Sequence, residues 1–115
     1  FDLVLYLGVL YHVRHPLLAL ERLAAVTRGT AIIETQAELF RGSGDRALCR
    51  FIEGDELNHD PSNFWTFNAE ALLSMCRSAG FESAEVRQPP GRWKRRAVAM
   101  VRGSASYRAV VHASR

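Results

Sequence analysis

The residues best suited to chemistry follow the first apolar run of the sequence. Tyr11, His12, Arg14 and His15 come within eight residues of the end of that run at Leu7. Two histidines around an arginine suggest a metal site. Their spacing, however, does not match the i, i+4 pair that binds a metal from one helix, and no nearby carboxylate completes a ligand set. The sequence therefore predicts no metal centre, and His12 is expected to be a hydrogen-bonding loop residue rather than a general base.

Further candidates lie at the end of the second apolar run and in an aromatic cluster. Glu34 ends the second run, where it can either meet a substrate or pair with an arginine. Trp65 and Phe67 can form a stacking wall for a planar substrate or pack against the helix that follows them, and both interpretations stay open. The side chains of Glu56, His59 and Asp60, in the loop before them, are expected to be solvated.

The two cysteines, Cys49 and Cys76, lie far apart and form no CxxC pair. This spacing argues against structural zinc and against a disulfide framework, so we expect two reduced thiols in a cytoplasmic protein. Cys76 falls inside a helical pattern and is expected to be a small core residue.

Charge is distributed unevenly along the 115 residues. The net charge is +3, yet residues 86–115 carry eight basic side chains and no acidic one. A basic end suggests an anionic partner, either a nucleic acid or a carboxylate or phosphate substrate, although a solvated cationic surface is the simpler explanation. No apolar run reaches the roughly 18 residues of a membrane span.

Structural elements must position these residues, and the first part of the sequence predicts a strand, a helix and a strand. Residues 2–7 are a continuous apolar run, typical of a strand that is covered on both faces in a parallel sheet. A helix is predicted over 16–28, with Pro16 at its first position and Gly29 as a C-cap, and a second strand over 30–36. This order is that of a βαβ unit.

The second part of the sequence predicts a different order. Asn68 is a favourable N-cap for a helix, and the Pro89-Pro90-Gly91 turn permits an antiparallel pair of strands around it. The elements predicted here are a long glycine-punctuated loop over 37–62, a helix over 69–79, strands over 82–88 and 96–102, and a fraying tail over 104–115.

Taken together, the pattern predicts an α/β fold with a mostly parallel sheet that ends in an antiparallel hairpin. The first strand is too apolar to be a free edge, so we expect upstream strands, with residues 1–103 forming the C-terminal half of a domain. In open α/β sheets ligands bind beyond the carboxyl ends of the strands. The loop 8–15, Glu34 and the aromatic cluster should meet there.

Three blocks of sequence resemble one enzyme family. "FDLVLYLGVLYHVRHPLLALERL", followed by "IIET", resembles the fourth and fifth strands of class I S-adenosylmethionine-dependent methyltransferases, which have a Rossmann-like fold. "GDELNHDPSNFWTFNAEALLSMCRSAGF" looks like the downstream block of the branch that includes the tRNA wobble-uridine carboxymethyltransferases, which use carboxy-S-adenosylmethionine. "RRAVAMVR" looks like the last strand of that branch. The three blocks in this order are more specific than any one of them alone.

The resemblance implies a cofactor site and an acceptor site. Leu7, Gly8 and Tyr11 are similar to the segment that lines the cofactor, with Tyr11 near its donor group. Arg96 corresponds to an arginine at the start of the last strand, which helps to bind the cofactor's carboxylate in the carboxymethyl-transferring members. The acceptor side is expected to use His12, Arg14, Glu34, Asn63 and Trp65. No catalytic residue is assigned, because the sulfonium is an activated donor and the protein mainly aligns the reactants.

These expectations describe the C-terminal half of an S-adenosylmethionine-dependent methyltransferase, inactive alone, that acts on a small-molecule or RNA acceptor. A tRNA wobble-uridine carboxymethyltransferase that uses carboxy-S-adenosylmethionine is the alternative within the family. A non-catalytic RNA-binding module that uses the basic end is the alternative of another class, and it predicts salt-dependent RNA binding without a cofactor. The glycine-rich turn and the acidic residue that hold the cofactor in this family are expected upstream of residue 1.

Overall fold

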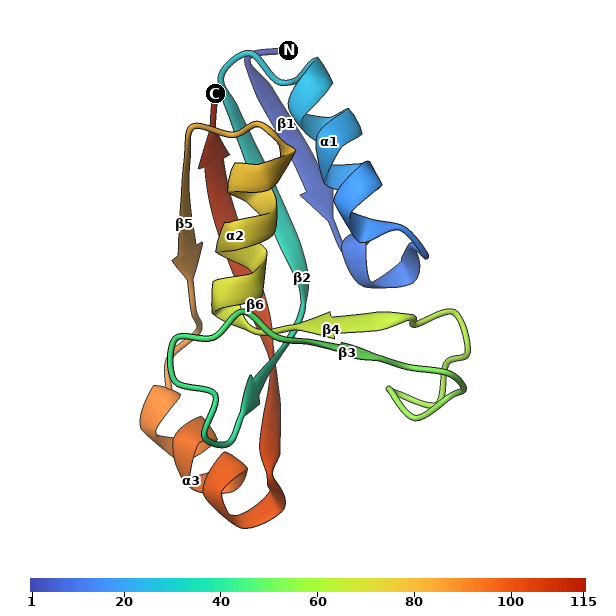
Figure 1. Cartoon of the computed structure of the whole chain (residues 1–115), viewed down its shortest axis with the longest axis vertical. Helices are drawn as coiled ribbons and strands as arrows, with labels where there is room; N and C mark the ends of the chain where they lie inside the picture. The colour runs from blue at the N-terminus through green and yellow to red at the C-terminus, as the bar shows by residue number, and fades with distance from the viewer.

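The computed structural model describes all of residues 1–115. It is a mixed α/β structure in which six strands form one sheet (Figure 1). In chain order the elements are β1 (Leu3–Leu7), the short 3-10 helix η1 (Leu10–His12), α1 (Pro16–Val26), β2 (Thr30–Phe40), β3 (Cys49–Phe51), β4 (Trp65–Phe67), α2 (Ala69–Ala79), β5 (Ser83–Arg87), α3 (Arg92–Arg102) and β6 (Ser104–Ser114). None of the helices has both the length and the apolar character of a membrane span.

The two long strands β2 and β6 form the centre of the sheet. They pair antiparallel along their whole length, from Thr30 opposite Ser114 to Phe40 opposite Ser104. β1 runs parallel to the first half of β2, and β5 pairs antiparallel with the last residues of β6. The β3–β4 hairpin joins β2 beyond the end of β1, through the pairing of Ala37 with Phe67.

The expected mostly parallel sheet is therefore only partly confirmed. Two of the strand pairs are parallel, β1 with β2 and β2 with β4, and three are antiparallel. The strands predicted over 2–7, 30–36 and 82–88 are all present. The loop predicted over 37–62 is interrupted, because β2 continues to Phe40 and β3 lies inside it.

The end of the chain departs most from the sequence-based expectation. Residues 96–102 are not a strand but the second part of α3, and residues 104–115 are not a fraying tail, because Ser104–Ser114 form β6. The expected hairpin is thus a pair between β5 and β6 with a helix in the connection. The period of the side chains explains the difference. Alternate β6 residues (Ala105, Ala109, Val111 and Ala113) are buried, which is the two-residue repeat of a strand.

Helix α1 begins at Pro16 as predicted and ends earlier than predicted, at Val26. Its C-cap is Thr27, whose hydroxyl donates a hydrogen bond of 2.7 Å to the carbonyl oxygen of Leu23. Gly29, expected to be the cap, has another role. A Cβ at this position would lie 2.2 Å from the backbone carbonyl oxygen of Asp2, so glycine lets the chain pass close to the start of β1.

The predicted bounds of helix α2 are confirmed at both ends. The side-chain oxygen of Asn68 accepts a hydrogen bond of 2.8 Å from the backbone N–H of Ala71, which is the capping bond that the sequence predicted. At the other end Gly80 has a φ of 117°, a left-handed conformation that glycine adopts at low cost.

Both α1 and α2 cover the same face of the sheet (Figure 1). The core lies between them and the sheet, and its largest buried side chains include Leu20, Ile33, Phe67 and Leu72. β1 contributes Val4 and Tyr6 to this core, while its other face is bare, with Leu3 and Leu5 59% and 60% exposed. The expectation that β1 is covered on both faces is therefore wrong for this chain.

Candidate active site

The loop that follows β1 turns back toward the middle of β2. Gly8 adopts a φ of 69°, and its N–H donates a hydrogen bond of 2.9 Å to the carbonyl oxygen of Glu34. The chain then forms η1, in which Leu10 and Tyr11 are buried. Gly8 thereby ties the loop at the carboxyl end of β1 to the middle of β2, which continues to Phe40. Ligands bind beyond the carboxyl ends of strands in open α/β sheets. Leu7, by contrast, is about half exposed on the bare face of the sheet.

Tyr11 meets an arginine that the sequence analysis missed. Arg108 of β6 donates a hydrogen bond of 3.1 Å to the Tyr11 hydroxyl, and its guanidinium carbon lies 4.9 Å from the centre of the Tyr11 ring. A second nitrogen of Arg108 lies 3.7 Å from a carboxylate oxygen of Glu34. Of the two roles that the sequence left open for Glu34, pairing with an arginine is the one observed.

Arg96 does not occupy the place that the resemblance assigned to it. It lies in α3 rather than at the start of the last strand, and it lines a groove of about 260 Å³ together with Arg41 and Met100. The last strand is β6, and its arginine is Arg108. The tripeptide Arg-Ala-Val occurs twice, at 96–98 and at 108–110, and only the second copy belongs to a segment with a two-residue period. The two-residue period around the second copy was therefore the sequence signal that could have placed Arg108 on the last strand.

His12 joins the η1 segment to the long loop. Its Nδ1 lies 3.0 Å from the carbonyl oxygen of Ser62, and its ring stacks on Tyr11 at 4.0 Å between centroids. The Ser62 hydroxyl donates a hydrogen bond of 2.7 Å to Asp60, and the Ser62 backbone N–H donates another. These two bonds lower the pKa of Asp60, the hydroxyl bond being the larger cause. His12 is therefore a hydrogen-bonding loop residue, as expected.

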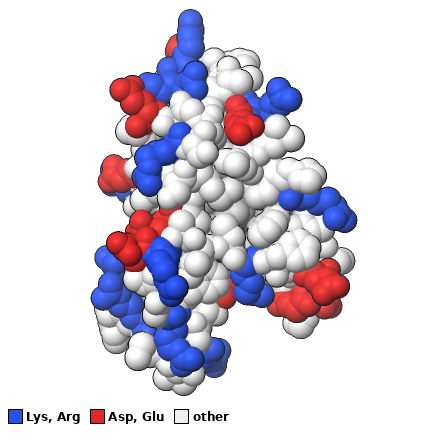
Figure 2. Space-filling view, in the orientation of Figure 1, with Lys and Arg blue, Asp and Glu red and all other residues white.

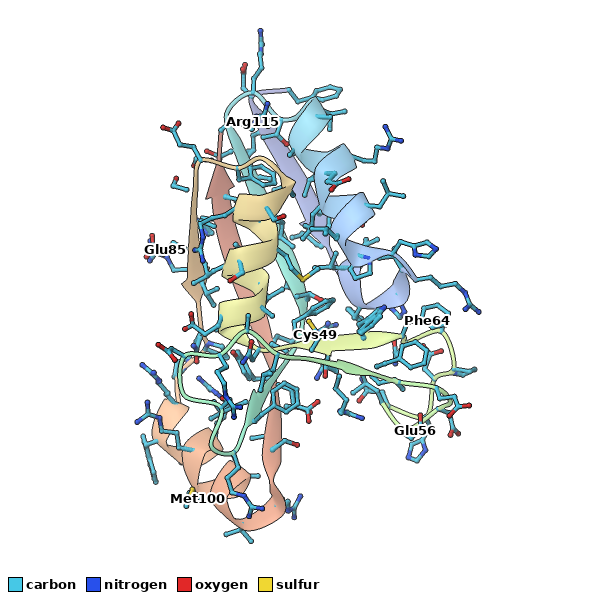
Figure 3. The ribbon with its side chains drawn as sticks, viewed as in Figure 1. Cys49, Glu56, Phe64, Glu85, Met100 and Arg115 are labelled. Atoms are coloured by element: carbon cyan, nitrogen blue, oxygen red, sulfur yellow. The ribbon has the colours of Figure 1, made fainter.

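Arg14 and the aromatic cluster form one contact surface beside this loop. The guanidinium carbon of Arg14 lies 4.7 Å from the centre of the Phe64 ring, and the Trp65 indole N–H donates a hydrogen bond of 3.2 Å to the Arg14 carbonyl oxygen. The Trp65 ring also meets Phe51 edge-on at 5.2 Å. Phe64 lies on the side of the β3–β4 hairpin nearest the loop after β1 (Figure 3). Phe67 is fully buried, so its packing interpretation is the correct one.

Asn63 supports the long loop from inside. Its side chain is 1% exposed, and its Nδ2 donates a hydrogen bond of 2.7 Å to the Leu57 carbonyl oxygen, whereas its Oδ1 has no partner. The next residue, Phe64, donates its backbone N–H to the Tyr11 carbonyl oxygen at 2.8 Å. The expected contact of Asn63 with an acceptor therefore remains a prediction, since the residue's visible role is to shape the loop next to Tyr11.

The arrangement suits binding and alignment of a polar ligand. A guanidinium, a phenol and a carboxylate converge at the carboxyl end of β1 and beside the middle of β2, and the aromatic cluster contacts them through the Phe64 N–H bond to Tyr11. Arginine in such a position offers directed donors for a carboxylate or another anion. No group of three or more histidine, cysteine, aspartate or glutamate side chains is placed to hold a metal ion.

Comparison with solved structures reveals close likeness along the whole chain. The N-terminal domain of EvdMO1 with S-adenosylhomocysteine bound matches 100% of this chain with a TM-score of 0.61 and 23% sequence identity. The same domain in the presence of S-adenosylhomocysteine and D-fucose matches 100% of it with a TM-score of 0.60. Phosphoethanolamine N-methyltransferase 2 of Haemonchus contortus, in complex with phosphomonomethylethanolamine and S-adenosylhomocysteine, matches 98% with a TM-score of 0.63 and 13% identity.

The likeness establishes a shared fold. This chain spans 47% of the EvdMO1 N-terminal domain and 33% of the Haemonchus contortus enzyme, so it corresponds to about half or less of each. No protein-family description matches the sequence, and no curated protein is similar enough to it to count as a relative.

Proposed function

We propose that this chain is the C-terminal half of a class I S-adenosylmethionine-dependent methyltransferase domain. The observation that carries the proposal is that 98–100% of the chain matches part of two proteins crystallised with S-adenosylhomocysteine, one of which is an N-methyltransferase. The uncovered outer face of β1 supports it, since a strand with Leu3 and Leu5 exposed lacks the cover that a complete domain provides.

In this proposal the residues at the carboxyl end of β1 and those beside the middle of β2 have different roles. Gly8 and Tyr11, with Leu7 before them, line the cofactor near its donor group. Arg108 and Glu34 orient polar groups beside it. Methyl transfer needs alignment of nucleophile, methyl group and sulfur with water excluded, and it needs a protein base only when the acceptor must lose a proton. The acceptor, a small molecule or an RNA, contacts the side formed by His12, Arg14, Asn63 and Trp65.

One observation favours carboxymethyl transfer as a second candidate. In the carboxymethyl-transferring members that this chain resembles, an arginine of the last strand helps to bind the carboxylate of carboxy-S-adenosylmethionine. The tyrosine that corresponds to Tyr11 lies near the donor group of the cofactor. Arg108 and Tyr11 are hydrogen-bonded at 3.1 Å, which supports this reading of the site. A guanidinium next to a phenol offers a carboxylate two kinds of donor. A tRNA acceptor would follow only if this donor is used.

The test is a calorimetric titration of the longer protein that carries this chain with S-adenosylmethionine and with its carboxylated form. Tyr11→Ala should weaken cofactor binding by about tenfold, since it removes the ring that lines the donor group. Tyr107→Ala is the control, because Tyr107 points to the opposite face of β6 from Arg108 and stacks under Arg95. Equal affinities of Tyr11→Ala and the unchanged protein would contradict the proposed site.

The proposal also predicts the behaviour of the 115 residues alone. Without the upstream glycine-rich turn they should bind S-adenosylmethionine weakly and methylate nothing. RNA binding that depends on salt, needs no cofactor and survives Tyr11→Ala would instead support the RNA-binding alternative. Tight cofactor binding by the 115-residue chain would refute the assignment to half a domain.

A further inference from the structure

The outward face of α3 is apolar although the helix is strongly basic. Trp93, Met100 and Val101 are 72%, 66% and 84% exposed. Together with Ala97, which is also exposed, they follow the i, i+4, i+7, i+8 spacing of one helix face. Met100 lies on α3 at the end of the molecule farthest from α1 (Figure 3). Three large apolar side chains on one short helix thus point away from the protein.

Cationic side chains border this apolar face on both sides. Arg96 lies along one edge and Lys94 along the other, and both are exposed, as are Arg92 and Arg102 at the two ends of the helix. Figure 2 shows the basic side chains gathered over the end of the molecule that α3 forms. Residues 86–115 contain no acidic side chain, and the nearby acids are Glu38 and Glu70, which line a pocket together with Arg92 and Arg96.

The rest of α3 attaches it to the protein, so the outward face has no internal role. Ala99 is the one buried residue of the helix and contacts the sheet side. Arg95 stacks on the Tyr107 ring at 4.8 Å and donates hydrogen bonds of 3.0 Å to the carbonyl oxygens of Pro89 and Pro90. These contacts hold the helix with Trp93 and Val101 outward.

The start of α3 lacks its usual stabilisation. No side chain caps the helix, its first turn holds no acidic residue, and Arg92 and Lys94 bring positive charge to the positive end of the helix dipole. An anionic surface beside this end would offset both charges. A partner that is both negatively charged and apolar would therefore stabilise this helix.

We propose that α3 docks the protein onto an anionic phospholipid surface. A helix with Trp and aliphatic residues on one face and Lys and Arg beside them lies in the plane of the membrane interface, with its apolar side among the acyl chains and its cations on the lipid phosphates. Single-stranded RNA fits less well, because Met100, Val101 and Ala97 have no face on which bases stack. The proposal is independent of the proposed methyltransferase function.

The test is flotation of the longer protein with vesicles of phosphatidylglycerol and phosphatidylcholine, compared with phosphatidylcholine alone. Binding should require the anionic lipid and weaken as salt is raised. The double change Trp93→Ser with Val101→Ser should lower vesicle affinity by about tenfold or more. Arg92→Gln with Lys94→Gln should lower it and flatten the salt dependence.

Val26→Ser, a change of an exposed apolar residue at the end of α1, is the matched control and should bind vesicles like the unchanged protein. Thermal unfolding of each variant checks that the fold persists, which is expected because all the changed side chains are exposed. Three results would overturn the proposal: equal binding to neutral vesicles, no effect of Trp93→Ser with Val101→Ser, or tighter binding to single-stranded RNA that ignores this double change.

Discussion

Arg108 reaches Tyr11 across a separation of 97 residues in the chain. The sequence alone identified Tyr11 because it stands inside a compact motif, next to residues whose types support one another. The two-residue period could have placed Arg108 on a strand, but it could not make Arg108 the partner of Tyr11, since that contact depends on the register of β6 on β2, where Arg108 lies opposite Gln36. A local pattern carries no information about such a register, and the similar Arg-Ala-Val at Arg96 offered a false match.

The first prediction compares these two arginines in the longer protein. Arg108→Ala should lower the methyl-transfer rate by about tenfold, because it removes a charge-assisted hydrogen bond worth roughly 1.5 kcal/mol at Tyr11 and leaves Glu34 without its cation. Arg96→Ala, on α3, should have a much smaller effect. Initial rates at saturating donor measure both variants, and equal losses would show that the Arg108–Tyr11 pair does not belong to the site.

The second prediction concerns pH. Burial raises the pKa of the Cys76 thiol from 9.0 to about 11, partly opposed by the charge of Arg77. The unfolded chain therefore ionises this thiol first, so the stability contributed by the neutral thiol is fully present below pH 9 and is lost as the pH rises toward 11.

Urea unfolding at several pH values between 9 and 11 measures this loss, which should reach about 2 kcal/mol. Cys76→Ala should be less stable at neutral pH but should lose less on going to alkaline pH. Burial also raises the pKa of the Cys49 thiol, but Cys49 lies closer to the surface than Cys76, so Cys49→Ala should keep more of the decline than Cys76→Ala. Parallel curves for all three proteins would contradict the assignment to Cys76.

Among the elements, α2 was predicted with correct bounds and α3 was not predicted at all. The signals that define α2 are local, since Asn68 and Gly80 cap its two ends and its apolar residues repeat at helical spacing. α3 begins at Arg92, after Gly91, which has no side chain to cap it, and its apolar residues face outward, so residues 96–102 resembled a short apolar strand. The elements that the sequence mispredicted are those whose apolar pattern is decided by a partner outside the element.

The third prediction tests the cap of α2. The Asn68 side chain accepts hydrogen bonds from the N–H groups of Ala71 and Leu48, at 2.8 and 3.0 Å, and donates one of 2.7 Å to the Arg46 carbonyl oxygen. Asn68→Ala should destabilise the fold by about 2–3 kcal/mol, because it uncaps the helix and leaves buried backbone groups unpaired. Asn68→Asp keeps the acceptor oxygen and should cost less. Urea unfolding ranks the two variants, and a loss under about 0.5 kcal/mol for Asn68→Ala would rule out this role.

For the molecule as a whole, one face of the sheet is covered by helices and the other face is exposed. α1 and α2 bury one side, while the other shows an apolar strip on β1 and polar residues on β5, where Ser83, Glu85 and Arg87 are exposed. The sequence predicted that β1 needs neighbours, but which face lacks them follows from the register of β1 on β2, where Leu5 lies opposite Ile32. Apolar surface of this kind favours association.

The fourth prediction follows from this bare face. The 115-residue chain alone should self-associate as its concentration rises, and Leu5→Lys should reduce the association because it places a charge in the middle of the exposed strip. Ser83→Lys adds the same charge at the polar side of the same face and serves as the control. Sedimentation equilibrium measures the mass of each, and a monomeric unchanged chain at every concentration would contradict the prediction.

The central position of β6 has a consequence for how the chain is made. β6 is synthesised after every other strand described here, yet it lies between β2 and β5. As the chain emerges during translation, β2 must wait without its longest partner, on the order of ten seconds at usual elongation rates. Throughout that interval the edges of β2 and β5 that β6 later occupies stay open to wrong partners. Helices α1 and α2, whose backbone hydrogen bonds are local, can form before β6 is made and can cover one face of the incomplete sheet.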